Sequence, residues 1–326
     1  MTSQSNPQEF HRGPQMTLSM QLTAEQLAVM KEWHASVPTL YFLDICVVGA
    51  TKLSDAALER DARKKRLVEH LQNLDRPQHA FSYLLAVLEK ISDSRGVATD
   101  AELEEQILGD LTALRAFFKN ARVYEPDEFV IQFLRELRRQ PIELQRSNYL
   151  SFLEAINNRF ALKDPVAPAL RLQKAKEILD EADSLSISRQ QPVVALALAC
   201  LYGNRAAKKL MKFKSTAEKF NAENALADIM AIPRLARFKL EIEYMGRQGG
   251  RYLRLDFITD DDGLIGVLDC FEPTAVKHEN SSDVSGTQYT FTVKLKRLLT
   301  EIGPDEYEEL LHLLIAESGV APDVRR

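Results

Sequence analysis

The chain of 326 residues is 45% hydrophobic and 27% charged, a composition typical of a folded protein with a sizeable core, which excludes a largely disordered chain. Its net charge of −5 at pH 7 argues against a nucleic-acid binder with a wholly basic surface. Its longest apolar runs are shorter than the roughly 18 residues that a membrane helix needs, and its three cysteines lie far apart, as in proteins of reducing compartments. We therefore expect a cytoplasmic protein that does not span a membrane.

The N-terminal part of the chain contains an arm and then a strand. Residues 1–20 are rich in Gln, Ser and Pro and contain no apolar stretch, which predicts a flexible arm rather than a secretory signal. The apolar run over residues 40–48, closed by Gly49, predicts a buried parallel strand. Asp44 lies inside this run, and a buried carboxylate is costly unless it is paired, hydrogen-bonded or bound to a metal. Asp44 therefore either caps the following turn or belongs to a site at the end of the strand.

A mainly helical region is predicted from Thr23 to about Ile232, because apolar residues recur there three and four positions apart. One of its helices is expected over residues 193–202, since a proline precedes this apolar segment and a glycine follows it. A short second strand is expected over residues 122–125.

A basic stripe follows the helix over residues 193–202. It consists of Arg205, Lys208, Lys209 and Lys212, which recur at helical spacing. Two interpretations stay open, because such a stripe forms either a solvated helix face or a surface that contacts the phosphates of a nucleic acid.

The C-terminal part of the chain changes its periodicity at Ala236, where the apolar period shortens to about two and predicts an antiparallel sheet. The strands are expected over residues 238–244, 252–257, 264–271 and 288–295. A closing helix is expected from about Asp305 to Glu317. The segment Asp260–Gly263 lacks the alternating acids of an EF-hand calcium loop, so a β-turn is expected there.

These patterns predict an α+β fold. The flexible arm over residues 1–20 is followed by a mainly helical domain over residues 21–233 and by a small antiparallel β domain with a C-terminal helix over residues 234–326. The boundary between the last two is expected near Pro233.

The strand with Asp44 resembles a known family. Its sequence, Leu-Tyr-Phe-Leu-Asp-Ile-Cys-Val-Val, is similar to the opening strand of PIN-like nucleases, whose first metal-binding aspartate ends a hydrophobic strand near the start of the domain. The helix over residues 79–93 carries Glu89 on or beside its apolar side, where that family places its second acid. The segment from Leu103 to Pro126 resembles the next helix and strand of the family. The resemblance covers about residues 38–230 and implies a small parallel α/β sheet inside the helical domain.

The resemblance also implies a metal site. PIN-like domains carry further aspartates at the start of an Ala-rich helix and in the strand after it, but the similar helix here begins without an acid. The later acids then have to come from Asp180, Asp183 or Asp228, and Asp228 lies nearest the apolar side of its helix. By this resemblance, Asp44, Glu89 and Asp228 are the expected catalytic residues and the ligands of Mg²⁺ or Mn²⁺.

Two functions stay open at this stage. One is a metal-dependent PIN-like ribonuclease, acting as a toxin or defence effector, in which the basic stripe binds RNA and the C-terminal sheet binds a protein partner or positions the substrate. The other is a non-catalytic cytoplasmic module for protein interaction with a degenerate site. The nuclease requires the three carboxylates to converge. The interaction module predicts that a local amide or a basic side chain satisfies Asp44, with no acidic crevice around it.

Overall fold

The structure is a computed structural model, and it describes residues 22–92, 99–138, 143–281 and 284–315; the arm expected over residues 1–20 lies outside these ranges. The chain divides into two compact units, residues 1–37 and 38–326. The described part of the first unit is helix α1 (Ala24–Ser36), which opens with a capping box. In this box the backbone N–H of Gln26 donates to the Thr23 hydroxyl, and the Thr23 N–H donates to the Gln26 side chain.

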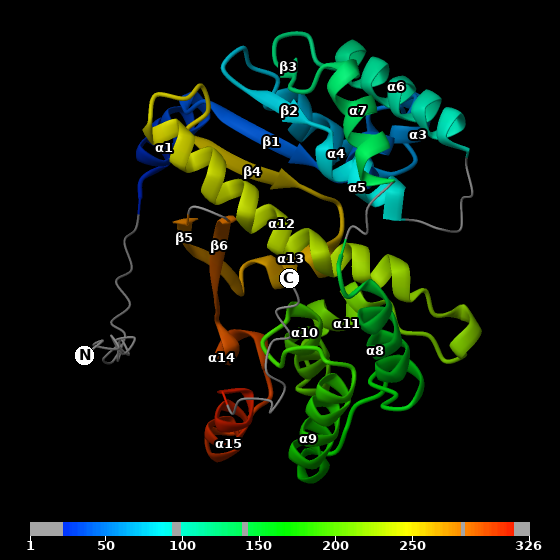
Figure 1. The fold of residues 1–326 in the computed structure, drawn as a ribbon. Helices are drawn as coiled ribbons and strands as arrows, with labels where there is room; N and C mark the ends of the chain where they lie inside the picture. The colour runs from blue at the N-terminus through cyan, green and yellow to red at the C-terminus, as the bar shows by residue number, and fades with distance from the viewer. Residues whose placement is uncertain (1–21, 93–98, 139–142, 282–283, 316–326) are drawn as a thin grey trace. The chain divides into compact units, whose positions relative to one another are not determined.

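A parallel sheet organises the second unit (Figure 1). Its strands are β1 (Thr39–Leu43), β2 (Ala80–Ser82), β3 (Arg122–Val123) and β4 (Arg254–Ile258). They lie in the order β3-β2-β1-β4, and every pairing is parallel. The buried strand expected over residues 40–48 is confirmed for residues 40–43, but residues 45–50 form a helix that Asp44 caps. The short strand expected over residues 122–125 is confirmed at residues 122–123.

The carboxyl ends of β1 and β4 form the switch point of this sheet. The chain leaves β1 to build β2 and β3 on one side, and it returns much later to place β4 on the other side of β1. In an open parallel sheet such a reversal leaves a crevice outside the carboxyl ends of the two strands, and this is where ligands bind.

Helices make up most of the rest of the second unit (Figure 1). Those between β1 and β4 are α2 (Ile45–Ala50), α3 (Asp55–Leu58), α4 (Ala62–Asn73), α5 (Leu84–Ser92), α6 (Asp100–Phe117), α7 (Asp127–Leu137), α8 (Arg146–Asn158), α9 (Pro168–Ser184), α10 (Pro192–Leu201), α11 (Arg205–Met211), the 3₁₀ helix η1 (Ala217–Lys219) and α12 (Ala222–Arg247). After β4 follow α13 (Asp262–Leu268), α14 (Leu295–Leu298) and α15 (Pro304–Ile315).

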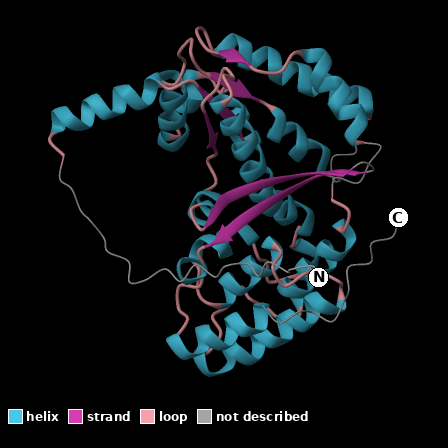
Figure 2. Ribbon diagram, turned by 60° about the vertical axis from the view of Figure 1, so that its left-hand side comes forward, coloured by secondary structure: helices cyan, strands magenta, loops and turns pink. Residues whose placement is uncertain are grey.

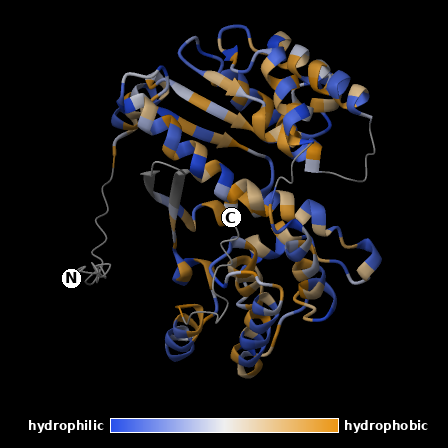
Figure 3. Cartoon of the chain, in the orientation of Figure 1, coloured by the Kyte–Doolittle hydropathy of each residue, from blue (hydrophilic) through white to orange (hydrophobic). Residues whose placement is uncertain are grey.

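Apolar packing covers both faces of β1. Tyr41 and Leu43 belong to one core cluster with residues of α4, α5, α6 and α7, whereas Leu40 and Phe42 belong to another with residues of α5, α12 and β4. A strand that is buried on both faces needs a continuous apolar run, which explains the pattern that first marked it. A third cluster joins α8 to α13 and includes the apolar helix α10, which Figure 3 colours as hydrophobic along its length.

The region after residue 236 differs from the expectation. Residues 236–247 form the end of α12 rather than a strand, because Phe238 and Ile242 lie one helical turn apart and pack together against the cluster of β1 and β4. The ring of Phe238 stacks on Phe42 with 5.1 Å between their centroids. Pro233, where a domain boundary was expected, lies inside this helix.

The remaining C-terminal strands are also rearranged. The strand expected over residues 252–257 is β4 of the parallel sheet, and residues 262–268 form the helix α13. Among the described residues, only β5 (Phe271–Ser281) and β6 (Val284–Val293) pair in an antiparallel manner, as the long two-stranded ribbon of Figure 2 shows. The closing helix is confirmed as α15. The helices, the parallel sheet and the separate antiparallel pair confirm the α+β class.

Membrane-spanning helices are absent from the described ranges, since none of the helices there combines sufficient length with sufficient hydropathy to cross a bilayer.

Close packing of α11 on α13 depends on Gly263. A Cβ atom at Gly263 would lie 2.6 Å from the backbone nitrogen of Leu210, whereas a Cβ at Gly49 in α2 would meet nothing within 4 Å. We expect Gly263→Ala to lower the free energy of unfolding by about 1–3 kcal/mol because α11 and α13 must separate. Gly49→Ala is the control, and it should leave stability unchanged or slightly raised. Urea unfolding of both variants checks this, and equal stabilities would contradict it.

Candidate functional site

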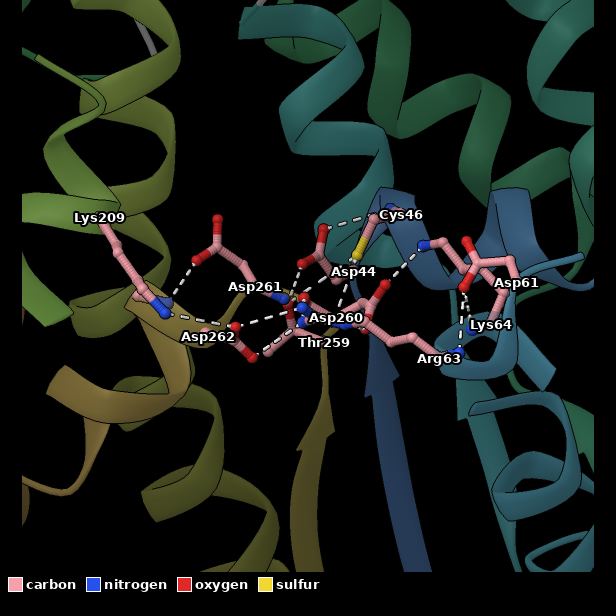
Figure 4. Close-up of polar contacts among 11 residues, drawn as sticks. Asp44, Cys46, Asp61, Arg63, Lys64, Lys209, Thr259, Asp260, Asp261 and Asp262 are labelled. Atoms are coloured by element: carbon pink, nitrogen blue, oxygen red, sulfur yellow. Dashed lines mark hydrogen bonds and ion pairs between the residues drawn. The ribbon is translucent and has the colours of Figure 1, made fainter. Parts of the chain in front are cut away.

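Asp44 lies at the switch point, directly after β1, and is only 7% exposed. Its carboxylate caps α2 by accepting a hydrogen bond from the backbone N–H of Cys46 at 3.4 Å. It also accepts a hydrogen bond from the hydroxyl of Thr259, the residue that follows β4 (Figure 4). Asp44 is thus a helix cap, one of the two roles expected for it, and it also joins the two strand ends that define the crevice.

Glu89 approaches Asp44 from α5, a helix that packs against both α2 and α12. Its side chain is hydrogen-bonded to Asp44, and burial, together with the negative charges of Asp44 and Asp228, raises the pKa of the Glu89 carboxyl to about 9. At neutral pH the Glu89 carboxyl therefore keeps its proton, which it donates to Asp44.

Asp228 completes the set of acids expected from the sequence. It lies on α12, where Asn224 donates to its Oδ2 at 3.2 Å and the Lys212 ammonium pairs with the same oxygen at 2.6 Å. Burial raises the pKa of Asp228 to about 6 against the lowering effect of Lys212. Glu89 is thus hydrogen-bonded to Asp44 and lies within electrostatic range of Asp228, so the three predicted residues share one neighbourhood.

A fourth acid, Asp261, was missed by sequence reasoning. Its Oδ1 caps α13 by accepting from the N–H groups of Gly263 at 2.7 Å and Leu264 at 3.0 Å, and its Oδ2 lies 3.5 Å from the Lys212 ammonium. The sequence pattern predicts a β-turn over residues 260–263, and this expectation hid Asp261 as a site residue. The signal that could have found it is its position shortly after the apolar residues Leu255, Phe257 and Ile258.

Basic residues hold the loop after β4 on both sides (Figure 4). Arg63 and Lys64, at the start of α4, pair with Asp260, and Arg63 also pairs with Asp262 at 2.9 Å. On the other side Lys209 lies 3.5 Å from Asp262. These contacts neutralise Asp260 and Asp262 at the rim and leave Asp261 to interact with the acids of the crevice.

A cavity of about 150 Å³ opens beside these acids. It is lined by Ile45, Glu89, Lys90, Ser92, Glu223, Asn224, Ala227 and Asp228. The carboxylates of Glu89 and Asp228 thus line a cavity that is large enough for a small ligand or a few waters. Asp44 is not among the residues that line this cavity, and Lys90 is, so the cavity does not decide between the nuclease and the interaction module.

Lys212 is the basic residue that pairs with these acids, whereas Lys90, which lines the cavity, pairs with Asp110. Within the described residues, every ion pair made by Asp44, Glu89, Asp228 and Asp261 involves Lys212. Arg234 attracts Glu89 electrostatically, but its guanidinium pairs with Glu143.

The predicted basic stripe divides into two parts. Arg205, Lys208 and Lys209 lie on α11, and the Lys208 ammonium donates to the Lys163 carbonyl at 3.4 Å. Lys212 is the C-cap of α11 in the left-handed conformation, with φ 52°, and it reaches the acids instead of continuing the stripe. Contact of the stripe with phosphate stays a prediction.

The acids suit a hard divalent cation by their chemistry. Mg²⁺ and Mn²⁺ take carboxylate oxygens, and the crevice carries more carboxylates than Lys212 neutralises. In their present arrangement, no three His, Cys, Asp or Glu side chains of the described ranges are placed to hold one ion. Apart from this placement, the proton on Glu89 and the ion pair of Lys212 with Asp228 also oppose a cation at Asp44, Glu89 and Asp228.

Comparisons with known proteins add no family. No family model matches the sequence, and no curated protein or solved structure matches it.

Proposed function

We propose that the protein is a metal-dependent PIN-like nuclease that cleaves RNA at the crevice beyond β1 and β4. The observation that supports this is the mutual interaction of Asp44, Glu89 and Asp228, which come from three separate elements and which the sequence also predicts as site residues. Carboxylates gathered at the switch point of a parallel sheet are the donor set that a nuclease needs for Mg²⁺ or Mn²⁺.

The roles of the residues follow from their contacts. Asp44, Glu89 and Asp228 are the proposed ligands, and Thr259 fixes the orientation of the Asp44 carboxylate through its hydrogen bond. A bound Mg²⁺ or Mn²⁺ supplies Lewis-acid stabilisation of the scissile phosphate and a bound water of lowered pKa. The exposed side chains of Arg205 and Lys209 lie on the helix that leads to Lys212, and they provide positive charge for the RNA backbone.

Calorimetric titration with Mn²⁺ tests the proposal. Wild type is expected to bind Mn²⁺, and Asp44→Asn is expected to weaken binding by roughly tenfold or more, because a neutral amide replaces a charged ligand. Asn caps a helix as well as Asp does, so the variant should stay folded, which circular dichroism verifies. Asp180→Asn, at an exposed carboxylate on α9, is the matched control and should bind as wild type does. A folded wild type that binds no Mn²⁺ would rule out the metal-dependent reaction.

An interaction module is the second candidate, and one observation favours it. Asp44 is already satisfied by the Cys46 amide and the Thr259 hydroxyl, so its burial needs no metal. This candidate predicts that Asp44→Ala costs about 0.5–2 kcal/mol of stability through the lost cap, while Mn²⁺ has no effect on either protein. The partner surface would then be the antiparallel sheet, which in the structure is the pair β5 and β6.

A further inference from the structure

Lys212 pairs with two of the four carboxylates of the acidic crevice, which consists of Asp44, Glu89, Asp228 and Asp261. Its ammonium lies 2.6 Å from Asp228 Oδ2 on α12 and 3.5 Å from Asp261 Oδ2 after β4, so one side chain bridges two elements that the chain brings together. Its backbone is left-handed, at φ 52° and ψ 36°, a conformation that costs a non-glycine residue about 1 kcal/mol. The ion pairs of Lys212 with Asp228 and Asp261 help to offset this cost, since non-glycine residues keep such backbones where the surrounding structure holds them in place.

The neighbouring Lys209 differs from Lys212 in its partners. It lies on the same short helix, and its ammonium is 3.5 Å from Asp262, an exposed carboxylate that Arg63 also binds. Neither Asp262 nor Lys209 contacts the acids of the crevice in the described part of the chain. The two lysines therefore carry equal charge on one element, but only Lys212 neutralises candidate metal ligands.

We propose that Lys212 is the built-in counter-cation of the acidic crevice, and that it competes with a divalent metal ion for Asp228 and Asp261. This inference rests on the proposed function, because it concerns the metal of that site. Asp228 Oδ2 cannot accept the lysine ammonium and ligate a metal at full strength at the same time. Metal entry requires the lysine to leave, and the energy of its ion pairs is subtracted from the affinity for the metal.

Mn²⁺ titration of three proteins tests this: wild type, Lys212→Gln and Lys209→Gln. Lys212→Gln is expected to bind Mn²⁺ roughly tenfold more tightly than wild type. The substitution removes both the cation that competes for the carboxylates and the repulsion between that cation and the metal. Lys209→Gln removes the same charge from the same helix, and its affinity should stay within about twofold of wild type because Lys209 is partnered at the rim.

A second variant separates the charge effect from the backbone effect. Lys212→Asn also removes the cation, but asparagine tolerates the left-handed conformation, so this variant should keep the end of α11 intact and bind Mn²⁺ as tightly as Lys212→Gln. Thermal unfolding in EDTA verifies that each protein is folded before titration.

The outcomes distinguish this inference from the proposed function. Equal Mn²⁺ affinity in all four proteins, or weaker binding in both Lys212 variants, overturns the inference and leaves the metal site in place. No Mn²⁺ binding in any of the proteins overturns both. Binding by the Lys212 variants but not by wild type supports the inference, and it identifies the lysine as the group that keeps metal out.

Discussion

Glu89→Gln is expected to stabilise the protein at pH 8, by on the order of 2–4 kcal/mol in EDTA. The pKa of Glu89 is about 9 in the folded protein, against an ordinary value of 4.5, so between these values the folded state binds a proton that the unfolded state releases. Stability therefore falls as the pH rises from about 4.5 to about 9. Glutamine resembles the protonated acid and has no charge to bury, so the free energy of unfolding of the variant should not fall over this pH range because of residue 89.

Urea unfolding at two pH values checks this expectation. Wild type and Glu89→Gln should have nearly equal free energies of unfolding at pH 4.5 and should differ at pH 8. Glu177→Gln is the control, because Glu177 is exposed on α9 and accepts a hydrogen bond from Gln173 at 3.1 Å. A Glu89→Gln protein that is less stable than wild type at pH 8 would mean that Glu89 is ionised there.

The parallel sheet was only partly predictable from the sequence. Strand β1 was recognisable because its two buried faces impose a continuous apolar run. Its pairing with β4 joins residues more than 200 positions apart, for example Thr39 with Arg254, and local periodicity carries no information on such a contact. Residues 238–244 were misassigned because alternating apolar residues also fit a helix face when Phe238 and Ile242 pack together.

The candidate site was also only partly predictable from the sequence. The resemblance and the positions near apolar faces predict Asp44, Glu89 and Asp228, and in the structure Glu89 interacts with both of the others, although the described acids are not placed to hold one ion. Asp261 was not predicted, because residues 260–263 were expected to form a β-turn between antiparallel strands, whereas Asp261 caps α13 beyond the parallel strand β4. The position of Lys212 was not predictable from helical spacing, since the left-handed backbone at the end of α11 turns this residue away from the stripe.

The same Glu89→Gln substitution is expected to lower divalent-dependent cleavage of RNA by about 10²–10³-fold, comparable to the loss of one transition-state stabilising group. A neutral amide cannot replace an ionised ligand, and a bound metal would otherwise favour the ionised form of Glu89 by offsetting the charges of Asp44 and Asp228. The measurement is cleavage of a single-stranded RNA of mixed sequence at pH 8 with Mn²⁺, with Glu177→Gln as the control.

Stability and activity together decide what Glu89 does. If the role of Glu89 is only structural, removing its buried charge should give a more stable protein with unchanged activity. If Glu89 is instead a metal ligand, the same substitution should give a more stable protein that has lost activity, since functional residues are often held in environments that lower stability. A Glu89→Gln protein that is stabilised at pH 8 and cleaves RNA at the wild-type rate would remove Glu89 from the site, and it would leave Asp44, Asp228 and Asp261 as the candidate ligands.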